Sequence, residues 1–304
     1  MRKSLPNSIF REMANIRISF FGTRYVSNVA RDLKLNWWLC FNAVAADTVL
    51  IAIFWQSLVA EVFDIELEHC HRILLGAAVW LGYMADRVLD GFQITERVCS
   101  ARHSIAFRYR EILLLSWVAV LLLSICFAFH ALPFIELHKC CLLAIFCGFN
   151  SLVNLLDKFG KFPIPKELRT ALLFASGVFL FVALRLPELT TWSWITFLLF
   201  ASLCFANCCY AASWDRAVDM TQGQSSLILR RKPLLGLVCL ISFSMAFGCI
   251  ILSFFLSENL RLFFLAIGSA VLSLPLIDIL INGPENKRLL ADLGLLLSAG
   301  CVLL

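Results

Sequence analysis

The chain has 304 residues, of which 61% are hydrophobic and only 15% are charged, with a formal net charge of +5 and a mean hydropathy of +0.84. This composition excludes an ordinary soluble domain, gives no reason to expect a nucleic-acid partner, and indicates a polytopic membrane protein embedded in the lipid bilayer. The length leaves room for about nine spans of roughly 20 residues with short connections. The predicted fold class is therefore all-α, a bundle of about nine transmembrane helices.

The first 35 residues are basic and contain no apolar run long enough to cross a membrane. We predict a cytoplasmic or interfacial segment over residues 1–35, with its apolar side chains on the lipid and its arginines at the headgroups. A disordered basic tail is the alternative. The nine-helix membrane domain is expected over residues 36–304.

Nine apolar segments follow in chain order. Hydropathy predicts membrane spans near residues 36–60, 70–86, 111–130, 137–156, 168–186, 192–212, 234–256, 260–281 and 289–304. If the N-terminus is cytoplasmic, all but four of the 26 Lys/Arg residues fall on the cytoplasmic side. The four exceptions are Arg72, Lys139, Arg185 and Arg261. This bias predicts a multi-pass protein with a cytoplasmic N-terminus, in a bacterial-type inner or plasma membrane.

Two pairs of aspartates stand at predicted helix borders. Asp86 and Asp90 end the second predicted span, and Asp215 and Asp219 follow the sixth. A spacing of four residues puts both acids of a pair on one helix face, where they repel each other. Carboxylates near a helix C-terminus also oppose the helix dipole. Because both pairs fall on the predicted cytoplasmic side, they favour a compensating cation there.

A third acidic pair with the same spacing, Asp64 and Glu68, falls on the other side in a short loop. The spacing alone therefore does not define a site, and a solvated helix end is the alternative interpretation of each pair. The two aspartate pairs differ from this one in their shared side, their helix-border setting and the basic residues around them.

Carboxylate pairs beside lysines and arginines fit a diphosphate ligand held through Mg²⁺. Magnesium takes oxygen ligands and is commonly shared between carboxylates and substrate phosphates. It also stabilises diphosphate as a leaving group, while nearby cations neutralise the remaining charge. Since the surrounding bundle is apolar, the organic part of the predicted ligand is a hydrocarbon chain, and a lipid with such a head is a prenyl diphosphate.

The nine spans, with aspartate motifs after the second and sixth, resemble the UbiA superfamily of intramembrane prenyltransferases. The family's first motif ends in Asp-x-x-x-Asp, as at Asp86 and Asp90, although Gly82 and Tyr83 stand where the family usually has Asn-Asp. The second motif is matched by Tyr210-Ala211, Asp215, Asp219 and Gly223, and the basic segment before the fifth span by Lys166-Glu167-Leu168-Arg169 with Gly177.

The resemblance implies an enzyme that transfers an isoprenyl group, an alkyl group other than methyl, from a prenyl diphosphate to an aromatic or other lipophilic acceptor, as in quinone-type biosynthesis. The implied catalytic and Mg²⁺-binding residues are Asp86, Asp90, Asp215 and Asp219. The implied diphosphate-binding residues are Arg87, Lys166 and Arg102. The apolar bundle would shield the allylic cation from water.

Two other functions stay open. One is a non-catalytic membrane homologue with a scaffold or lipid-binding role. The other is a membrane transporter, which predicts broken helices at mid-membrane and repeated halves. Of the remaining acids, Asp47 is expected to be buried and hydrogen-bonded, whereas Asp278 and Asp292 are expected to pair with Lys287 and Arg288.

Overall fold

The computed structural model describes residues 41–42, 44–93, 101–156, 162–216, 226–230 and 233–303, which all belong to one compact unit, Phe41–Leu304. Within these ranges the chain forms helices and short connections and no strand. The helices are α4 (Ala46–Val62), α5 (His69–Gln93), α6 (Ala101–Ala131), α7 (Phe134–Leu156), α8 (Lys166–Arg185), α9 (Thr191–Trp214), the short α11 (Leu227–Arg230), α12 (Pro233–Ser253), α13 (Glu258–Leu280) and α14 (Pro284–Leu303). The predicted segment 1–35 lies outside the described residues.

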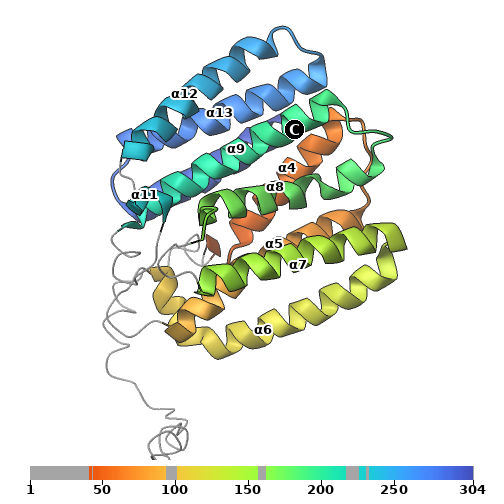
Figure 1. Ribbon diagram of the computed structural model, residues 1–304, viewed down its shortest axis with the longest axis vertical. Coiled ribbons are helices and arrows are strands. Elements are labelled where there is room, and N and C mark those ends of the chain that lie inside the picture. The colour runs from red at the N-terminus through yellow and green to blue at the C-terminus, as the bar shows by residue number, and fades with distance from the viewer. Residues whose placement is uncertain are drawn as a thin grey trace, which may run out of the picture. The chain divides into compact units, whose positions relative to one another are not determined.

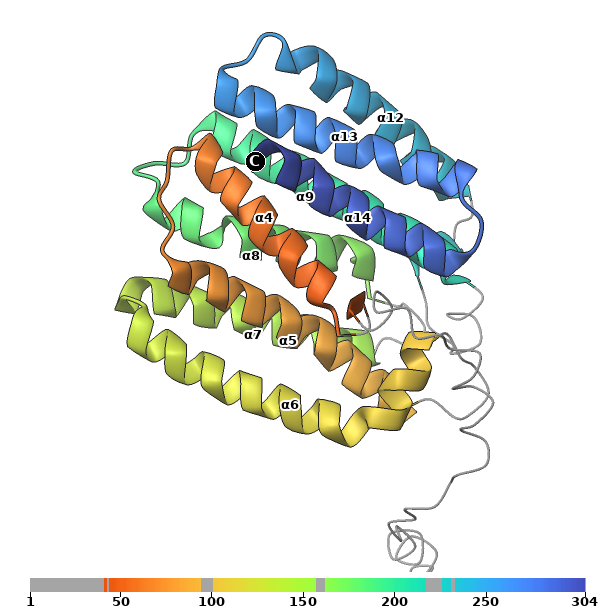
Figure 2. The ribbon, with the colours of Figure 1, turned by 180° about the vertical axis from the view of Figure 1, so that it is seen from behind.

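Each predicted span coincides with one long helix, and neighbouring helices lie side by side and run antiparallel (Figures 1 and 2). Among the described residues, six helices are long and apolar enough to cross a membrane: α6 from Tyr109 onward, α7, α8, α9, α12 and α13. The all-α class and the multi-pass membrane character are thereby confirmed. The α4 helix has only 17 residues, and α5 and α14 carry charged residues, so the number of nine spans stays a prediction.

The outer helices present apolar side chains outward. Helix α6 lies at one edge of the bundle and α12 at the other (Figures 1 and 2). On α6, Ile112, Leu115 and Leu123 are each at least 60% exposed. Such a surface is unsuited to water but suits lipid tails, because no polar group has to be desolvated there.

Trp55 lies at the centre of the buried core. Its side chain has no exposed surface, and its ring centroid lies 4.9 Å from that of Phe200 on α9 and 6.2 Å from that of Phe263 on α13. The indole N–H donates a hydrogen bond of 3.1 Å to the carbonyl oxygen of Leu295 on α14. One aromatic side chain therefore ties α4 to three later helices.

Several helix ends differ from the sequence prediction. Helix α4 begins at Ala46, after Ala45 in a left-handed conformation (φ 55°), rather than near residue 36. Helix α5 continues to Gln93, so Asp86 and Asp90 lie inside its last turns and not at its end. Hydropathy marks where apolar residues stop, whereas a helix that leaves the membrane can continue with polar ones. Helix α6 likewise begins at Ala101 and has a non-helical residue, Tyr109, before its apolar part.

Helices α12 and α13 approach closely at Gly268. A Cβ atom placed there would lie 3.0 Å from Cγ1 of Ile250 and 3.3 Å from the carbonyl oxygen of Ala246. Since overpacking forces neighbours to shift, we expect Gly268→Ala to lower the free energy of unfolding by about 1–2 kcal/mol. The matched control is Gly248→Ala on α12, where the added atom meets nothing within 4 Å. Equal thermal unfolding temperatures of the two variants in detergent would contradict the close packing.

Candidate functional site

Four of the predicted site residues lie at one end of the bundle. Because neighbouring helices are antiparallel, α5, α9 and α13 finish at the end where α4, α8, α12 and α14 begin (Figure 1). We call this the aspartate end. It carries Asp86 and Arg87 near the end of α5, Lys166 at the start of α8, and Asp215 directly after α9. The end with the loops 63–68, 132–133, 186–190 and 254–257 is called the opposite end.

Asp86 is more exposed than Asp215, the other predicted metal ligand whose side chain the structure describes. Its side chain is exposed, and among the described residues it takes part in no hydrogen bond or ion pair. Desolvation by the surrounding protein has the largest effect on this carboxyl group, and the charges of Lys166 and Arg87 act on it in the opposite direction. The structure therefore brings an accessible carboxylate on α5 near a lysine on α8, two residues that are far apart in the sequence.

Arg87 is directed toward the residues just before α4. Its Nη2 donates a hydrogen bond of 3.3 Å to the carbonyl oxygen of Asn42. The remaining predicted residues are only partly placed: Asp90 belongs to α5 and Arg102 to α6, but their side chains lie outside the described part of the structure, as does Asp219 altogether.

Asp215 caps the end of α9 and forms an ion pair with Arg288 of α14. Arg288 also donates a hydrogen bond of 3.4 Å to the carbonyl oxygen of Ala211. Both charged side chains are mostly buried, with 12% of Asp215 and 23% of Arg288 exposed. Unlike Asp86, Asp215 is thus already engaged by a cation of the protein itself.

Of the other acids at this end, Asp278 has an expected partner, whereas the hydrogen bond to Asp292 comes from Asn42 rather than from Lys287 or Arg288. The Nζ atom of Lys287 lies 2.7 Å from Oδ1 of Asp278, as predicted. Asn42 donates to Oδ2 of Asp47 at 2.5 Å and to Oδ2 of Asp292 at 3.2 Å. Asp47 is buried and hydrogen-bonded, which confirms its predicted role.

Tyr83 on α5 and two cysteines on α9 lie near one another at the aspartate end. Tyr83 lies one turn before Asp86, and 37% of its surface is accessible. Burial has the largest effect on its hydroxyl, and ionisable groups on α9, α14 and α4 act on it as well. Cys204 and Cys208 on α9 are only partly buried, and α5 makes little direct contact with α9. The sequence indicates only a packing role for these two cysteines inside an apolar span, and their spacing of four residues puts them on one helix face.

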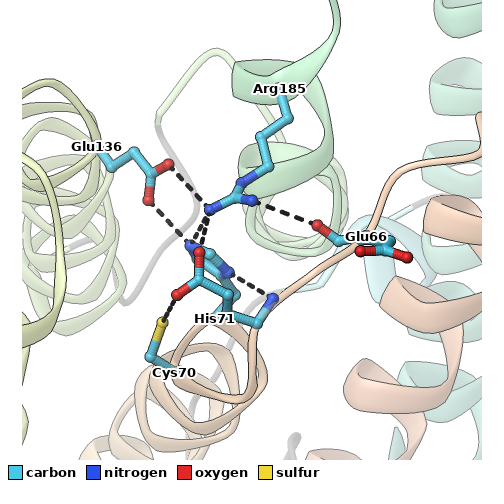
Figure 3. Close-up of polar contacts among 6 residues, drawn as sticks. Glu66, Cys70, His71, Glu136 and Arg185 are labelled. Atoms are coloured by element: carbon cyan, nitrogen blue, oxygen red, sulfur yellow. Dashed lines mark hydrogen bonds and ion pairs between the residues drawn. The ribbon is translucent and has the colours of Figure 1, made fainter.

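A second polar cluster lies at the opposite end, where no site was predicted (Figure 3). His71 on α5 is 1% exposed, and its Nε2 atom lies 2.9 Å from Oε2 of Glu136 on α7. Arg185 on α8 reaches Oε1 of Glu68 at 2.8 Å and Oε1 of Glu136 at 3.7 Å. Three helices and the loop before α5 therefore meet in one network.

The backbone fixes which nitrogen of His71 carries the proton. The amide N–H of Glu68 donates to Nδ1 of His71 at 3.1 Å, so Nδ1 is the acceptor and Nε2–H donates to Glu136. The guanidinium of Arg185 lies among these acids and supplies the positive charge. The described residues contain no group of three or more His, Cys, Asp or Glu arranged to hold a metal ion.

The ion pair of Glu68 and Arg185 should make a contribution to the stability of the fold that is lost in acid. The hydrogen bond and charge of Arg185 lower the pKa of the Glu68 carboxyl below its ordinary value. A lowered pKa stabilises the fold at pH values above the unfolded-state pKa, and this contribution disappears as the pH falls through the folded-state pKa. Glu68→Gln should therefore unfold at a slightly lower temperature than the parent at pH 7, and the difference should vanish under strongly acidic conditions. A difference that stays constant across this pH range would contradict the assignment.

No protein-family model, curated protein or solved structure matches this chain. The class of the protein is therefore defined by its own structure. It is an all-α, multi-pass membrane protein with an exposed carboxylate and basic side chains at one end.

Proposed function

We propose that this protein is an intramembrane prenyltransferase of the UbiA type, which transfers an isoprenyl group from a prenyl diphosphate to an aromatic or other lipophilic acceptor. The observation that carries the proposal is that Lys166 lies close enough to the exposed side chain of Asp86 to act on its charge, at the border of an apolar bundle. A carboxylate and an ammonium group that lie near each other without a direct bond suit a ligand with both a metal ion and phosphate oxygens. The carboxylate can bind the metal ion, and the ammonium group can bind the phosphate.

The residues fit Mg²⁺ in the chemistry of their donor atoms. Asp86 offers carboxylate oxygens that no other described side chain occupies, and Asp90 follows one turn later on the same helix face. Mg²⁺ would neutralise the diphosphate and favour its departure. In this proposal Asp86, Asp90, Asp215 and Asp219 hold the metal, and Lys166, Arg87 and Arg102 bind the diphosphate.

The side chains next to Asp86 support binding of the hydrocarbon part. Tyr83, one turn before Asp86, lies near Cys204 and Cys208 of α9, and these side chains can contact an apolar chain at little desolvation cost. A ligand with its head at Asp86 and its tail against these side chains would place the reacting carbon among apolar groups that exclude water.

The Asp215–Arg288 ion pair favours one alternative, a non-catalytic homologue that binds lipid. A carboxylate held by a buried arginine is a stable structural unit, and separating the two leaves uncompensated charges. In the proposed enzyme, the ion pair would open when the ligand binds. Asp215 would then hold the metal ion, and Arg288 would bind the phosphate oxygens instead. The two functions therefore differ in whether Asp215 takes part in ligand binding.

The test is binding of farnesyl diphosphate to the purified full chain in detergent, measured by calorimetry with and without Mg²⁺. We expect Mg²⁺-dependent binding that Asp86→Asn and Asp215→Asn each weaken roughly 10- to 100-fold, the loss of a charged interaction. Addition of an aromatic acceptor should then consume farnesyl diphosphate, releasing inorganic diphosphate and the prenylated acceptor, in the parent only.

The matched control is Asp64→Asn at the opposite end. Asp64 has a left-handed conformation (φ 54°) that asparagine tolerates, so the variant removes one acid without strain. It should bind like the parent. The lipid-binding alternative would be established if Asp86→Asn lost binding, Asp215→Asn kept it, and the parent showed no turnover. A folded parent that binds no prenyl diphosphate would reject both functions.

A further inference from the structure

A second pocket at the aspartate end has the features of an anion site. It has a volume of about 360 Å³ and is lined by residues of α9, α11, α12 and α13, by Arg216 two positions after α9, and by residues at the start of α14. The lining residues are Ser213, Trp214, Arg216, Ile228, Leu235, Asp278, Gly283, Pro284 and Lys287. It shares no lining residue with the Asp86–Lys166 site, and none of the functions considered above uses it.

Arg216 is the cation available to a ligand there. Its side chain is partly buried and lines the pocket, yet within the described ranges it makes no hydrogen bond or ion pair. A guanidinium that faces a pocket with five unused donors is suited to bind phosphate oxygens.

Lys287 is fixed in place beside this pocket and keeps one donor. Its Nζ donates to Oδ1 of Asp278 at 2.7 Å and to the carbonyl oxygen of Asp278 at 2.8 Å, so one of its three N–H groups remains. The indole of Trp214 donates to the same Oδ1 at 2.8 Å, which further neutralises that carboxylate. Among the described lining residues, Arg216 and Lys287 against Asp278 leave one positive charge in excess.

The backbone and the apolar wall complete the site. Helix α14 begins here, after Gly283 in a left-handed conformation (φ 86°), and a helix N-terminus attracts anions. Ile228, Leu235 and Pro284 supply apolar surface beside the charges. We propose that this pocket binds the phosphate of an amphiphile whose acyl chains lie along α12 in the bilayer, independently of the prenyl diphosphate site.

The test is native mass spectrometry of the delipidated full chain in detergent, titrated with dioleoyl phosphatidylglycerol in the presence of EDTA. Arg216→Gln should lower the affinity for the first bound lipid roughly tenfold, the loss of one charged hydrogen-bonding group. Arg216→Lys should retain part of it. Dioleoyl glycerol, which has the same tails and no phosphate, should bind weakly to parent and variant alike.

The matched control is Arg261→Gln, which removes one exposed arginine at the opposite end, 3.9 Å from its partner Glu258. It should bind the lipid like the parent, and so should Asp86→Asn, whatever its effect on prenyl diphosphate binding. Displacement of the lipid by inorganic phosphate in the millimolar range would identify a free anion as the ligand, and resistance to it would identify the lipid headgroup. Equal lipid binding by Arg216→Gln and Arg261→Gln, or equal binding of dioleoyl glycerol, would overturn the proposal.

Discussion

Replacing Trp55 with alanine is expected to lower the free energy of unfolding by about 3–5 kcal/mol, the usual loss for a large buried aromatic side chain. The ring is fully buried between Phe200 and Phe263, so its removal leaves a cavity that the surrounding helices fill only in part. The carbonyl oxygen of Leu295 also loses its indole donor. The measurement is reversible unfolding in mixed micelles, followed by circular dichroism.

Two further variants separate the loss of packing from the loss of the hydrogen bond and provide a control. Trp55→Phe keeps most of the packing and loses the hydrogen bond, which should cost about 1 kcal/mol for that bond plus the smaller ring. Trp194→Ala removes a tryptophan that is 54% exposed on α9 and should change the stability little. If Trp55→Ala and Trp194→Ala were equally stable, Trp55 would not lie in the core of the folded protein.

Glu136→Ala is expected to cost about 3 kcal/mol, because it leaves buried charged and polar groups without their partner. His71 loses the acceptor of its Nε2 proton, and Arg185 keeps only its contacts with the loop before α5. Glu136→Gln retains an oxygen acceptor for His71 and should lose less. Unfolding in mixed micelles again gives the values.

The control for this prediction is Glu258→Ala at the same end of the bundle. Glu258 is 78% exposed and lies 3.9 Å from Arg261, so its pair should contribute less than 1 kcal/mol. A loss in Glu136→Ala as small as that in Glu258→Ala would show that the network in Figure 3 does not hold α5, α7 and α8 together.

The helices were predictable because apolar runs of membrane length dominate this sequence. Each of the nine runs became a long helix, and Asp47 was recognised as buried because an acid among apolar residues needs a hydrogen-bond donor. The helix ends were less predictable. Asp86 and Asp90 stop the apolar pattern of α5, but charged residues do not stop a helix that leaves the membrane.

The polar partners depended on which helices become neighbours, and the sequence pattern contains no such information. Asp215 was assigned to a metal, yet in the structure its partner is Arg288, a residue that had been expected near Asp292. His71 and Glu136 lie on segments whose polar residues resemble solvated helix ends, and only the packing of α5 beside α7 makes them a buried pair. That Asp86 and Lys166 lie at the same end of the bundle, in contrast, follows from the antiparallel order that the short loops impose.

The hydrogen bond from Trp55 to Leu295 joins residues 240 positions apart, and the one from Asn42 to Asp292 joins residues 250 positions apart. During synthesis, α4 therefore emerges from the ribosome long before α14 exists. Until then the indole N–H of Trp55 and the side-chain amide of Asn42 lack their final partners, whereas Asp47 already has Asn42 and Thr48 close to it in the sequence. A chain that stops before α14 would keep these groups unsatisfied, which gives membrane quality control a physical means of telling an unfinished chain from a complete one.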